Sequence, residues 1–248
     1  MLLNLKNLVI KYSIQPSGII HIGAHTGEEV DTYNKYFKNN LSIHLFEPQD
    51  KYFKILKDKY SNIKNIKLYN FACGERKEKL NLNVASNDGV SSSLLKPKIH
   101  LEIHPDVQFN IKEKVSVDKL DNFNINDSDF LNIDVQGFEL KVLNGAKHTL
   151  PKINYIYLEI NKEEVYESAP MIGEIDEFLS KFNFIRVSTK YAYDTLPWGD
   201  ALYLNLNKLT NIQILKSKLK KFIYSKKNLY ELYIYFRRIF WKIKIFFA

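Results

Sequence analysis

Short apolar runs alternate with segments of helical spacing along most of this chain. Seven runs have the length and composition of buried strands: 19–22, 42–46, 66–70, 130–133, 155–159, 184–188 and 201–205. Apolar residues recur at helical spacing in 28–38, 50–60, 138–150 and 172–182. This alternation predicts an α/β fold, in which helices cover both faces of a mostly parallel, Rossmann-like sheet. The last two runs form a hairpin in this interpretation, so the last strand is antiparallel.

Two regions depart from this rhythm. Residues 80–117 contain short apolar runs, a turn-like Asn87-Asp88-Gly89 and then Ser91-Ser92-Ser93. This region predicts an inserted hairpin or loop over the edge of the sheet where a ligand would bind. Apolar residues at helical spacing in 1–12 indicate a short amphipathic helix rather than a signal peptide. The predicted organisation is a helix in 1–16, one domain in 17–206 and a tail in 207–248.

Composition and charge narrow the choice of compartment and partner. A chain of 248 residues fits one well-buried α/β domain. Its single cysteine, Cys73, excludes an internal disulfide and indicates a reducing compartment such as the cytoplasm. The net charge is +8, but residues 211–248 hold ten Lys or Arg and one acid, Glu231. The rest of the chain therefore carries a net charge of −1, which argues against a body that binds nucleic acid.

The cationic tail interleaves aromatic residues with Lys and Arg. Charge interrupts it too often for a bilayer span. The pattern is typical of a helix that lies at a membrane interface, and a helix that docks on the domain or on a second subunit is the alternative. RNA binding ranks last. The expected location is therefore cytoplasmic, with peripheral contact at the inner face of a membrane left open, as is the oligomeric state.

Candidate chemistry begins at the loop that follows the first apolar run. Gly23 and Gly27 stand four positions apart, and glycine lets the backbone approach a ligand closely. A helix would begin just after this loop with its N-terminus toward that ligand. Twenty positions after Gly27, Glu47 ends the second run, where a carboxylate suits the hydroxyls of a ribose. Together these features predict a nucleoside cofactor.

The glycine spacing also indicates which cofactor. A dinucleotide site favours G-x-G-x-x-G, and a phosphate-binding loop needs Gly-Lys-Ser/Thr; neither occurs in this sequence. A cofactor without a pyrophosphate needs less backbone to cradle phosphate. S-adenosylmethionine fits, because its adenosine can use Glu47 and its amino-acid end can use the glycine loop.

The ordered motifs resemble those of the FkbM-type methyltransferases over roughly residues 17–205. They are His21-Ile-Gly-Ala-His-Thr-Gly-Glu28, Phe46-Glu47-Pro48, Ser91-Ser92-Ser93-Leu94, Leu131-Asn-Ile-Asp-Val-Gln-Gly-Phe-Glu139, Val142-Leu-Asn-Gly-Ala146 and Gly199-Asp200-Ala201. The resemblance implies a class I methyltransferase fold and methyl transfer from S-adenosylmethionine to a hydroxyl oxygen, mostly of sugars and polyketide-type natural products. Gln136 departs from the family, which usually has Glu there, and this removes a charge near Asp134.

The candidate site residues fall into three groups. For the cofactor they are His21, Gly23, Ala24, Gly27, Glu47, Pro48, Ala72, Cys73 and Asp134. For catalysis, Glu159 is the first choice to orient or deprotonate the acceptor hydroxyl, and Asp134 is the second. For the acceptor they are Ser92, Asn161, Trp198 and Asp200. No recognisable metal-ligand spacing occurs, although a hard cation between Asp134 and Glu159 stays open.

Each candidate also has a structural explanation. Glu47 or Asp134 can serve at the start of a helix, and Glu159 can pair with Lys162 or another surface Lys. Cys73 suits a small buried side chain, Trp198 to Asp200 suit a hairpin loop, and His25 suits either the cofactor site or an exposed loop.

The sequence therefore leaves three possible functions for this protein. The first is an O-methyltransferase that acts on a hydroxyl of a small molecule or glycan. The second is a non-catalytic nucleoside-binding scaffold with a membrane- or partner-binding tail, which Gln136 favours. The third and weakest is an RNA methyltransferase.

Overall fold

The computed structural model describes residues 1–37, 40–193 and 196–210. The chain divides into two compact units, Met1–Asn205 and Leu206–Ala248. The first unit contains both sheets and the candidate site residues. Of the second, the described part is 206–210, with a 3-10 turn at Leu206–Lys208. The basic aromatic segment from 211 onward, and every expectation about it, lies outside the described residues.

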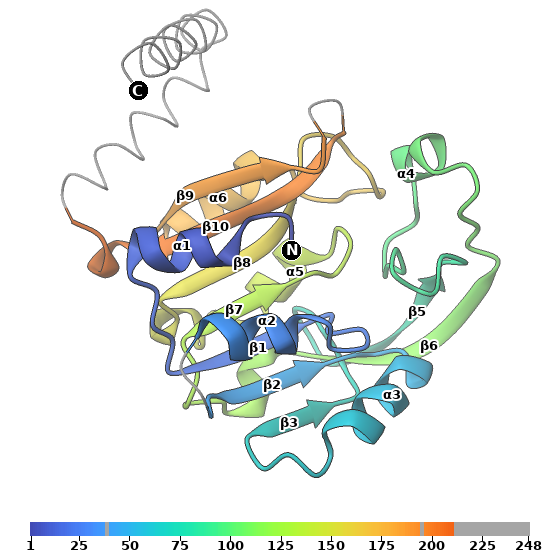
Figure 1. Cartoon of the computed structure of the whole chain (residues 1–248). Helices are drawn as coiled ribbons and strands as arrows, with labels where there is room; N and C mark the ends of the chain where they lie inside the picture. The colour runs from blue at the N-terminus through green and yellow to red at the C-terminus, as the bar shows by residue number, and fades with distance from the viewer. Residues whose placement is uncertain (38–39, 194–195, 211–248) are drawn as a thin grey trace, which may run out of the picture. The chain divides into compact units, whose positions relative to one another are not determined.

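The first unit is built on a seven-stranded sheet (Figure 1). Its strands are β1 (Gly18–Ile22), β2 (Ser42–Phe46), β3 (Ile66–Tyr69), β7 (Phe130–Ile133), β8 (Tyr155–Asn161), β9 (Phe184–Tyr191) and β10 (Trp198–Asn205). Their order is β3-β2-β1-β7-β8-β10-β9, and the five strands from β3 to β8 are parallel. Strand β10 runs antiparallel to both β8 and β9. The predicted mostly parallel sheet with an antiparallel last strand is confirmed.

Helices cover both faces of this sheet (Figure 1). They are α1 (Leu5–Tyr12), α2 (Glu29–Tyr36), α3 (Asp50–Tyr60), α5 (Glu139–Asn144) and α6 (Ile172–Ser180). Alternate residues of a strand point to opposite faces, so β1 buries Ile20 and Ile22 against the same core as Val142 of α5 and Leu179 of α6. On the other face, Tyr33 of α2 packs edge-on against Phe130 of β7. None of the helices in the described ranges is long and apolar enough to cross a membrane.

Helix α5 is shorter than the helical spacing in 138–150 predicts. It ends at Asn144, because the next residue, Gly145, passes close to the backbone of Gly74. A Cβ on Gly145 would lie 1.9 Å from the Gly74 carbonyl oxygen. The chain then turns, with Asp121 accepting from the backbone N–H of Thr149 at 2.8 Å, and a 3-10 turn follows at Leu150–Lys152. The prediction of a continuous helix was wrong, since its end depends on a contact between segments 70 residues apart.

The irregular region forms a second, three-stranded sheet in the order β4-β6-β5. Strand β5 (Glu78–Val84) pairs antiparallel with β6 (Ile111–Asp118), and β4 (Ala72–Cys73) pairs parallel with β6. A short helix, α4 (Ile99–Ile103), lies in the chain between β5 and β6. In the turn after β5, Asp88 and Gly89 have φ of 56° and 76°, the left-handed conformation that Asp and Gly tolerate best. The predicted inserted hairpin is present.

Candidate active site

A cavity of about 330 Å³ lies where β1, β2 and β7 end. Its lining comes from the loop after β1, the loop after β2, β4, the insertion and the loop after β7. Among the lining residues are His21, Gly23, His25, Glu28, Glu29, Glu47, Pro48, Gln49, Phe71, Ala72, Cys73, Leu82, Val90, Ser92, Leu94, Asp134 and Gln136. The carboxyl end of a parallel sheet is where such folds bind ligands.

The glycine loop after β1 is packed tightly between its neighbours. The backbone N–H groups of Gly23 and Ala24 donate to the carbonyl of Phe46, at 3.0 and 2.9 Å. Gly23 has φ of +83°, and a Cβ there would lie 1.8 Å from the Asp134 carbonyl oxygen. This position therefore accepts only glycine. The close approach holds the exits of β1, β2 and β7 at one rim.

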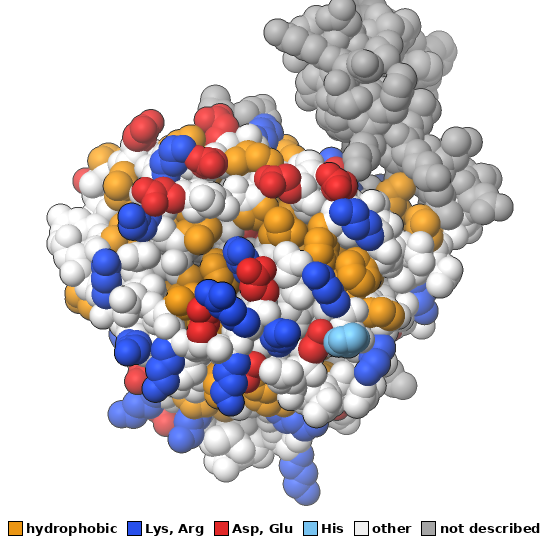
Figure 2. Space-filling model, turned by 180° about the vertical axis from the view of Figure 1, so that it is seen from behind, with side chains coloured by type: hydrophobic (Ala, Val, Ile, Leu, Met, Phe, Trp, Pro, Cys, Tyr) orange, Lys and Arg blue, Asp and Glu red, His pale blue; other side chains and the backbone are white. Residues whose placement is uncertain are grey.

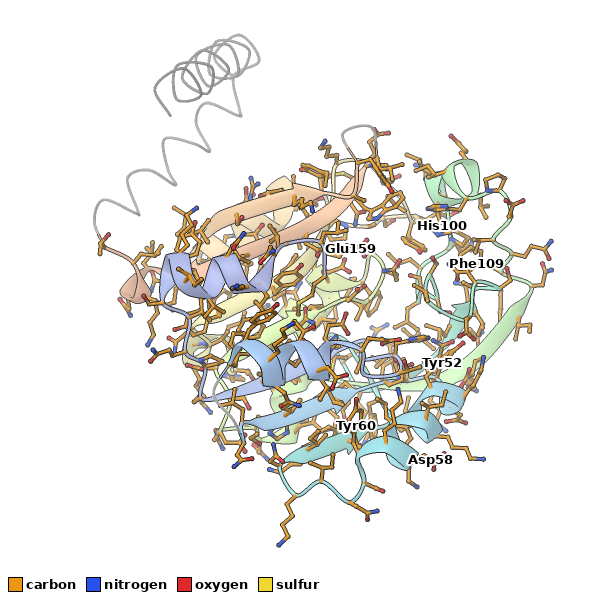
Figure 3. The ribbon with its side chains drawn as sticks, in the orientation of Figure 1. Tyr52, Asp58, Tyr60, His100, Phe109 and Glu159 are labelled. Atoms are coloured by element: carbon orange, nitrogen blue, oxygen red, sulfur yellow. The ribbon has the colours of Figure 1, made fainter. Side chains whose placement is uncertain are left out.

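Gly27 and Ala24 shape this loop but lie outside the cavity lining. Gly27 has φ of +79°, and the hydroxyl of Tyr60 on α3 donates to its carbonyl at 3.1 Å (Figure 3). Ala24 is fully buried. Their predicted contact with the cofactor stays a prediction, while their part in forming the turn is visible.

Glu47 points toward the glycine loop. Its Oε2 accepts from the backbone N–H of His25 at 2.9 Å, and its Oε1 accepts from the N–H of Gln49 at 2.8 Å. Gln49 is the N-cap of α3, so Glu47 also supports a helix start, as the structural explanation expected. Burial raises the pKa of Glu47 to about 7, against the opposing effect of these two N–H donors. A ligand hydroxyl that donates to this carboxyl would favour its charged form.

His25 joins the glycine loop to the insertion, a role that the sequence left undecided. Its Nε2 lies 2.9 Å from the carbonyl oxygen of Asp88, and its ring packs 4.1 Å from that of Tyr52, centre to centre (Figure 3). The Asp88 carboxylate in turn accepts from the Lys51 ammonium and the Tyr52 hydroxyl, at 2.7 and 3.0 Å. The turn of the insertion is thus fixed over the cavity by contacts from α3 and from the loop after β1.

Two carboxyls, Asp134 and Glu159, meet beside the cavity. The side-chain amide nitrogen of Gln136 lies 2.8 Å from Asp134 Oδ1 and 2.8 Å from Glu159 Oε2, so it donates to both. Asp134 lines the cavity and is exposed there, although many protein atoms lie around it. Glu159, on β8 (labelled in Figure 3), is 9% exposed and is not part of that lining, although it contacts Gln136, which is.

Both carboxyls bind protons more strongly than usual. Burial raises the pKa of Asp134, and the charges of Asp200 and Glu29 raise it further, while the hydrogen bond from Gln136 lowers it. The pKa of Glu159 is raised well above its ordinary value, first by burial and then by the charge of Asp134. Titratable groups shifted in this way and placed at a cavity are typical of catalytic sites.

Comparison with known proteins decides the family. The family model described as the methyltransferase FkbM domain matches residues 21–186, which include the glycine loop, Glu47 and the acid pair. The chain belongs to the FkbM methyltransferase family. It is an S-adenosylmethionine-dependent methyltransferase, as its motifs predict.

One curated relative and several solved structures are also similar to this methyltransferase. The 2-O-methyltransferase NoeI of Sinorhizobium fredii is 25% identical over 177 residues, which are 67% of this chain and 72% of the relative. An FkbM methyltransferase from Methylobacillus flagellatus KT matches with a TM-score of 0.49 and 14% identity, over 75% of this chain but 43% of that longer one. A methyltransferase from Aquifex aeolicus matches with a TM-score of 0.47 and 11% identity, over 82% and 90% of the two chains. Both TM-scores are below 0.5, so the assignment rests on the family match.

The charge of the methyltransferase cavity fits its cofactor. Four acidic side chains, Glu28, Glu29, Glu47 and Asp134, line the described cavity, and its lining includes no Lys or Arg side chain, although Met1 lines it too, with its terminal ammonium 3.7 Å from Glu29 Oε1. S-adenosylmethionine carries a sulfonium and an ammonium group, which acidic walls attract. A phosphate-bearing cofactor would need cationic or bare N–H donors instead.

The apolar part of the lining lies on the side of β4 and the insertion. Pro48, Ala72 and Cys73 line the cavity, and their contact with the cofactor stays a prediction. Burial raises the pKa of the Cys73 thiol, with a smaller effect from the charge of Asp118, so the thiol is neutral and serves as a small apolar wall. Ser92 also lines the cavity, and its hydroxyl donates to Gln49 Oε1 at 3.2 Å.

Three predicted acceptor residues, Asn161, Trp198 and Asp200, lie outside the lining of this cavity. The Asp200 carboxylate accepts from the Tyr157 hydroxyl and the backbone N–H of Leu2. Trp198 pairs in register with the buried Asn161 across β10 and β8. Their acceptor role stays a prediction, since a strand position predicts a sheet edge but not the direction of a side chain.

Two of the structural explanations from the sequence concern Asp134, as the start of a helix, and Glu159, as the partner of Lys162. In the structure, other residues make these contacts. Glu139, rather than Asp134, serves the start of α5, where its carboxylate accepts from the N–H of Gly137 at 3.1 Å. Lys162, the expected partner of Glu159, has its ammonium 3.5 Å from the centre of the Tyr191 ring. In the described ranges, no group of three or more His, Cys, Asp or Glu is arranged to hold a metal ion.

Proposed function

We propose that this methyltransferase acts on a hydroxyl oxygen of a sugar, a glycan or a related natural product. The observation that carries the proposal is the acid pair at the cavity, Asp134 and Glu159, joined through the Gln136 amide. Methyl transfer to oxygen needs a group that removes the proton of the hydroxyl. A carboxyl that reaches the cavity meets that need.

Residues of the glycine loop and β2 would hold the donor. Glu47 accepts the ribose hydroxyls, beside the backbone turn at Gly23. Burial lowers the pKa of His21, so its ring is neutral, and its Nδ1 lies 3.3 Å from the Tyr33 hydroxyl. The Asn132 amide donates to that hydroxyl at 2.7 Å, which leaves the hydroxyl proton for Nδ1. We therefore assign the ring proton to Nε2, from which it can be donated to the carboxylate of the donor. The four acidic side chains of the cavity lining complement the sulfonium and ammonium groups of the donor.

When bound, the donor supplies a methyl group on a sulfonium, and this activated group carries the hard chemistry. Asp134 takes the proton of the acceptor hydroxyl as that oxygen bonds to the methyl carbon and the carbon–sulfur bond breaks. The products are a methyl ether, S-adenosylhomocysteine and a protonated Asp134. General-base assistance of this kind contributes roughly 10²–10⁴-fold. Assigning the base to Asp134 reverses the order expected from the sequence, because Asp134 lines the cavity and Glu159 does not.

The acceptor class is supported by the family resemblance and by a relative. NoeI is a 2-O-methyltransferase by name, which favours transfer to oxygen. We assign acceptor contacts to Ser92 at the cavity and to Trp198, Asn161 and Asp200 beyond it. These last three lie outside the cavity lining and two of them are buried, so their assignment rests on the sequence, in which an aromatic ring beside polar side chains suits a sugar.

A panel of acceptors tests this proposal. The full chain is incubated with methyl-labelled S-adenosylmethionine and, in separate reactions, simple sugars, oligosaccharides, lipid-linked glycans and RNA. We expect label in a base-stable ether on at least one glycan. Donor binding without transfer to any acceptor would favour the scaffold function. Label only in RNA would favour an RNA methyltransferase. The face in Figure 2 has Lys and Arg interspersed with Asp and Glu, which does not favour RNA.

The tail carries a separate proposal, made from its sequence alone. We propose that it attaches the enzyme to the inner face of a membrane, where lipid-linked glycans are available. Co-sedimentation with anionic liposomes compares the full chain with a chain ending at 211. We expect the full chain to pellet and the shortened chain to stay in solution. Equal pelleting of the two would contradict membrane attachment.

A further inference from the structure

Gln136 occupies an unusual backbone position between the two carboxyls. Its φ is +54°, in the left-handed region that side chains other than Gly, Asn and Asp seldom adopt. The Ser93 hydroxyl donates to its carbonyl at 2.7 Å and so ties this conformation to the insertion. Strain of this sort persists where the surroundings hold it and is concentrated at functional sites. The result is that the Gln136 side chain projects between Asp134 and Glu159.

The orientation of the Gln136 amide is fixed by Tyr166. The Tyr166 hydroxyl lies 3.0 Å from Gln136 Oε1 and 2.9 Å from the carbonyl oxygen of Ser91, and it shares its one proton between these two acceptors. With Oε1 accepting from this hydroxyl, the amide NH₂ must face the carboxyls. A flipped amide would place an oxygen against two carboxyl oxygens. Tyr166 is fully buried, so water cannot substitute for its hydroxyl without rearrangement.

The groups around the pair are mostly acidic. Facing it are Asp200 on β10, Glu139 on α5, Glu29 on α2 and His21 on β1, together with the Tyr157 and Tyr166 hydroxyls. His21 is neutral, and the terminal ammonium of Met1, which lies 3.7 Å from Glu29 Oε1, is the cation at this cavity among the described residues, so the acids around the pair outnumber the cations. Two neighbouring carboxyls in such a setting share one proton. The Gln136 amide nitrogen, 2.8 Å from an oxygen of each carboxyl, holds the two side by side as this sharing requires.

We propose that Gln136, oriented by Tyr166, is a positioning residue that holds Asp134 and Glu159 as a pair with one proton. Glu159 keeps the proton and donates it toward Asp134, and the Gln136 amide supports the charged Asp134 carboxylate. Asp134 is thereby ready to take the acceptor proton. The inference deepens the proposed function and rests on it. It also explains how a Gln can stand where the family usually has Glu.

Kinetics of three variants test the inference on the full chain. Gln136→Leu removes the donor to Asp134, and Tyr166→Phe releases the amide. The control is Tyr203→Phe, which removes another fully buried tyrosine hydroxyl, one that donates to Asp176 at 2.9 Å. Each is assayed for donor binding by calorimetry and for the pH dependence of kcat on the best acceptor of the panel.

We expect the two site variants to bind donor within about twofold of the wild type and to lose kcat on the order of 10-fold or more. The acid limb of their pH profile should move to higher pH, because the Gln136 hydrogen bond lowers the pKa of Asp134. Tyr203→Phe should change neither kcat nor the position of the acid limb. A merely structural role would lower stability without moving the acid limb, and an unmoved limb in both site variants would overturn the inference.

A measurement without acceptor separates this inference from the proposed function. Carboxyl-¹³C NMR of the wild type should show one carboxyl of the pair titrating well above the ordinary range, and the signal should disappear in Asp134→Asn or Glu159→Gln. Gln136→Leu should raise the transition further. Ordinary titration of both carboxyls would overturn the inference, whereas absence of transfer to every hydroxyl acceptor would overturn the proposed function.

Discussion

The Glu47 carboxylate accepts a hydrogen bond from the backbone N–H of His25 at 2.9 Å, across the gap between the exits of β2 and β1. The backbone of His25 thus contacts the carboxyl that we propose binds the ribose, and its ring contacts Asp88 of the insertion. These contacts join three segments that line the cavity. This arrangement makes the insertion part of the donor site rather than an addition to it.

Removing the His25 side chain should loosen the insertion. In His25→Ala, the contacts to Asp88 and to the Tyr52 ring are lost, while the backbone N–H that serves Glu47 stays. We expect amide hydrogen exchange across 85–93 to accelerate and donor affinity to fall on the order of 10-fold, since ordering that segment would now oppose binding. His148→Ala, at an exposed position, is the control. Unchanged exchange at 85–93 would show that the contact does not hold the insertion.

Two glycine substitutions should have opposite effects on stability. Gly23→Ala forces a side chain into φ of +83° and against the Asp134 carbonyl, so we expect a loss of roughly 2–5 kcal/mol in the free energy of unfolding. Gly173→Ala, in α6, meets nothing within 4 Å and should gain about 0.5–1 kcal/mol. Urea denaturation measures both. Equal effects would mean that the glycine loop is not packed as described.

The acid pair should divide the catalytic work unequally. Asp134→Asn removes the base, and we expect kcat to fall roughly 10²–10⁴-fold, with a smaller loss of donor affinity because Asp134 is one of the four acids that line the cavity. Glu159→Gln keeps a donor to Asp134 and should cost about 10-fold. Glu113→Gln, whose carboxylate accepts from the N–H of Asp50 on α3, serves as the control. Steady-state rates with labelled donor measure kcat for each variant. Full activity of Asp134→Asn would show that Asp134 is not the base.

Glu139 should make stability depend on pH. It is 1% exposed, and burial raises its pKa from 4.5 to about 7. Between these values the folded protein keeps a proton that the unfolded chain has lost, so stability falls as pH rises through about 7. Relative to Glu139→Gln, the wild type should lose roughly 2–3 kcal/mol between pH 4.5 and pH 8. A difference that is constant with pH would contradict the raised pKa.

Periodicity was a good guide to the elements because most of them are bounded locally. Strand β2 and helix α3 have the predicted ends, since an apolar run gives way to Pro48 and then to Asp50 in the first turn. The meeting of Glu47 and the glycine loop followed from the same reasoning, because neighbouring parallel strands end at one edge. The same reasoning placed the end of helix α5 wrongly, because the chain leaves the helix where Gly145 packs against the backbone of Gly74.

The contacts that complete the site were not visible in the sequence. His25 meets Asp88, 63 residues away, and Gln136 meets Tyr166, 30 residues away. Neither pair has a local pattern, since each depends on how the insertion and the loop after β8 fold back on the sheet. Gln136 was noticed only as a departure from the family, and its hydrogen bonds to both carboxyls need the left-handed backbone that the structure shows.

The most direct test is a calorimetric titration with S-adenosylmethionine at pH 8, where Glu47 is charged. We predict that the wild type binds one donor per chain, that Glu47→Gln weakens binding about 10- to 100-fold through loss of a charged hydrogen bond, and that Glu174→Gln at the start of α6 binds as the wild type does. Absence of donor binding, or an unchanged Kd in Glu47→Gln, would contradict the account.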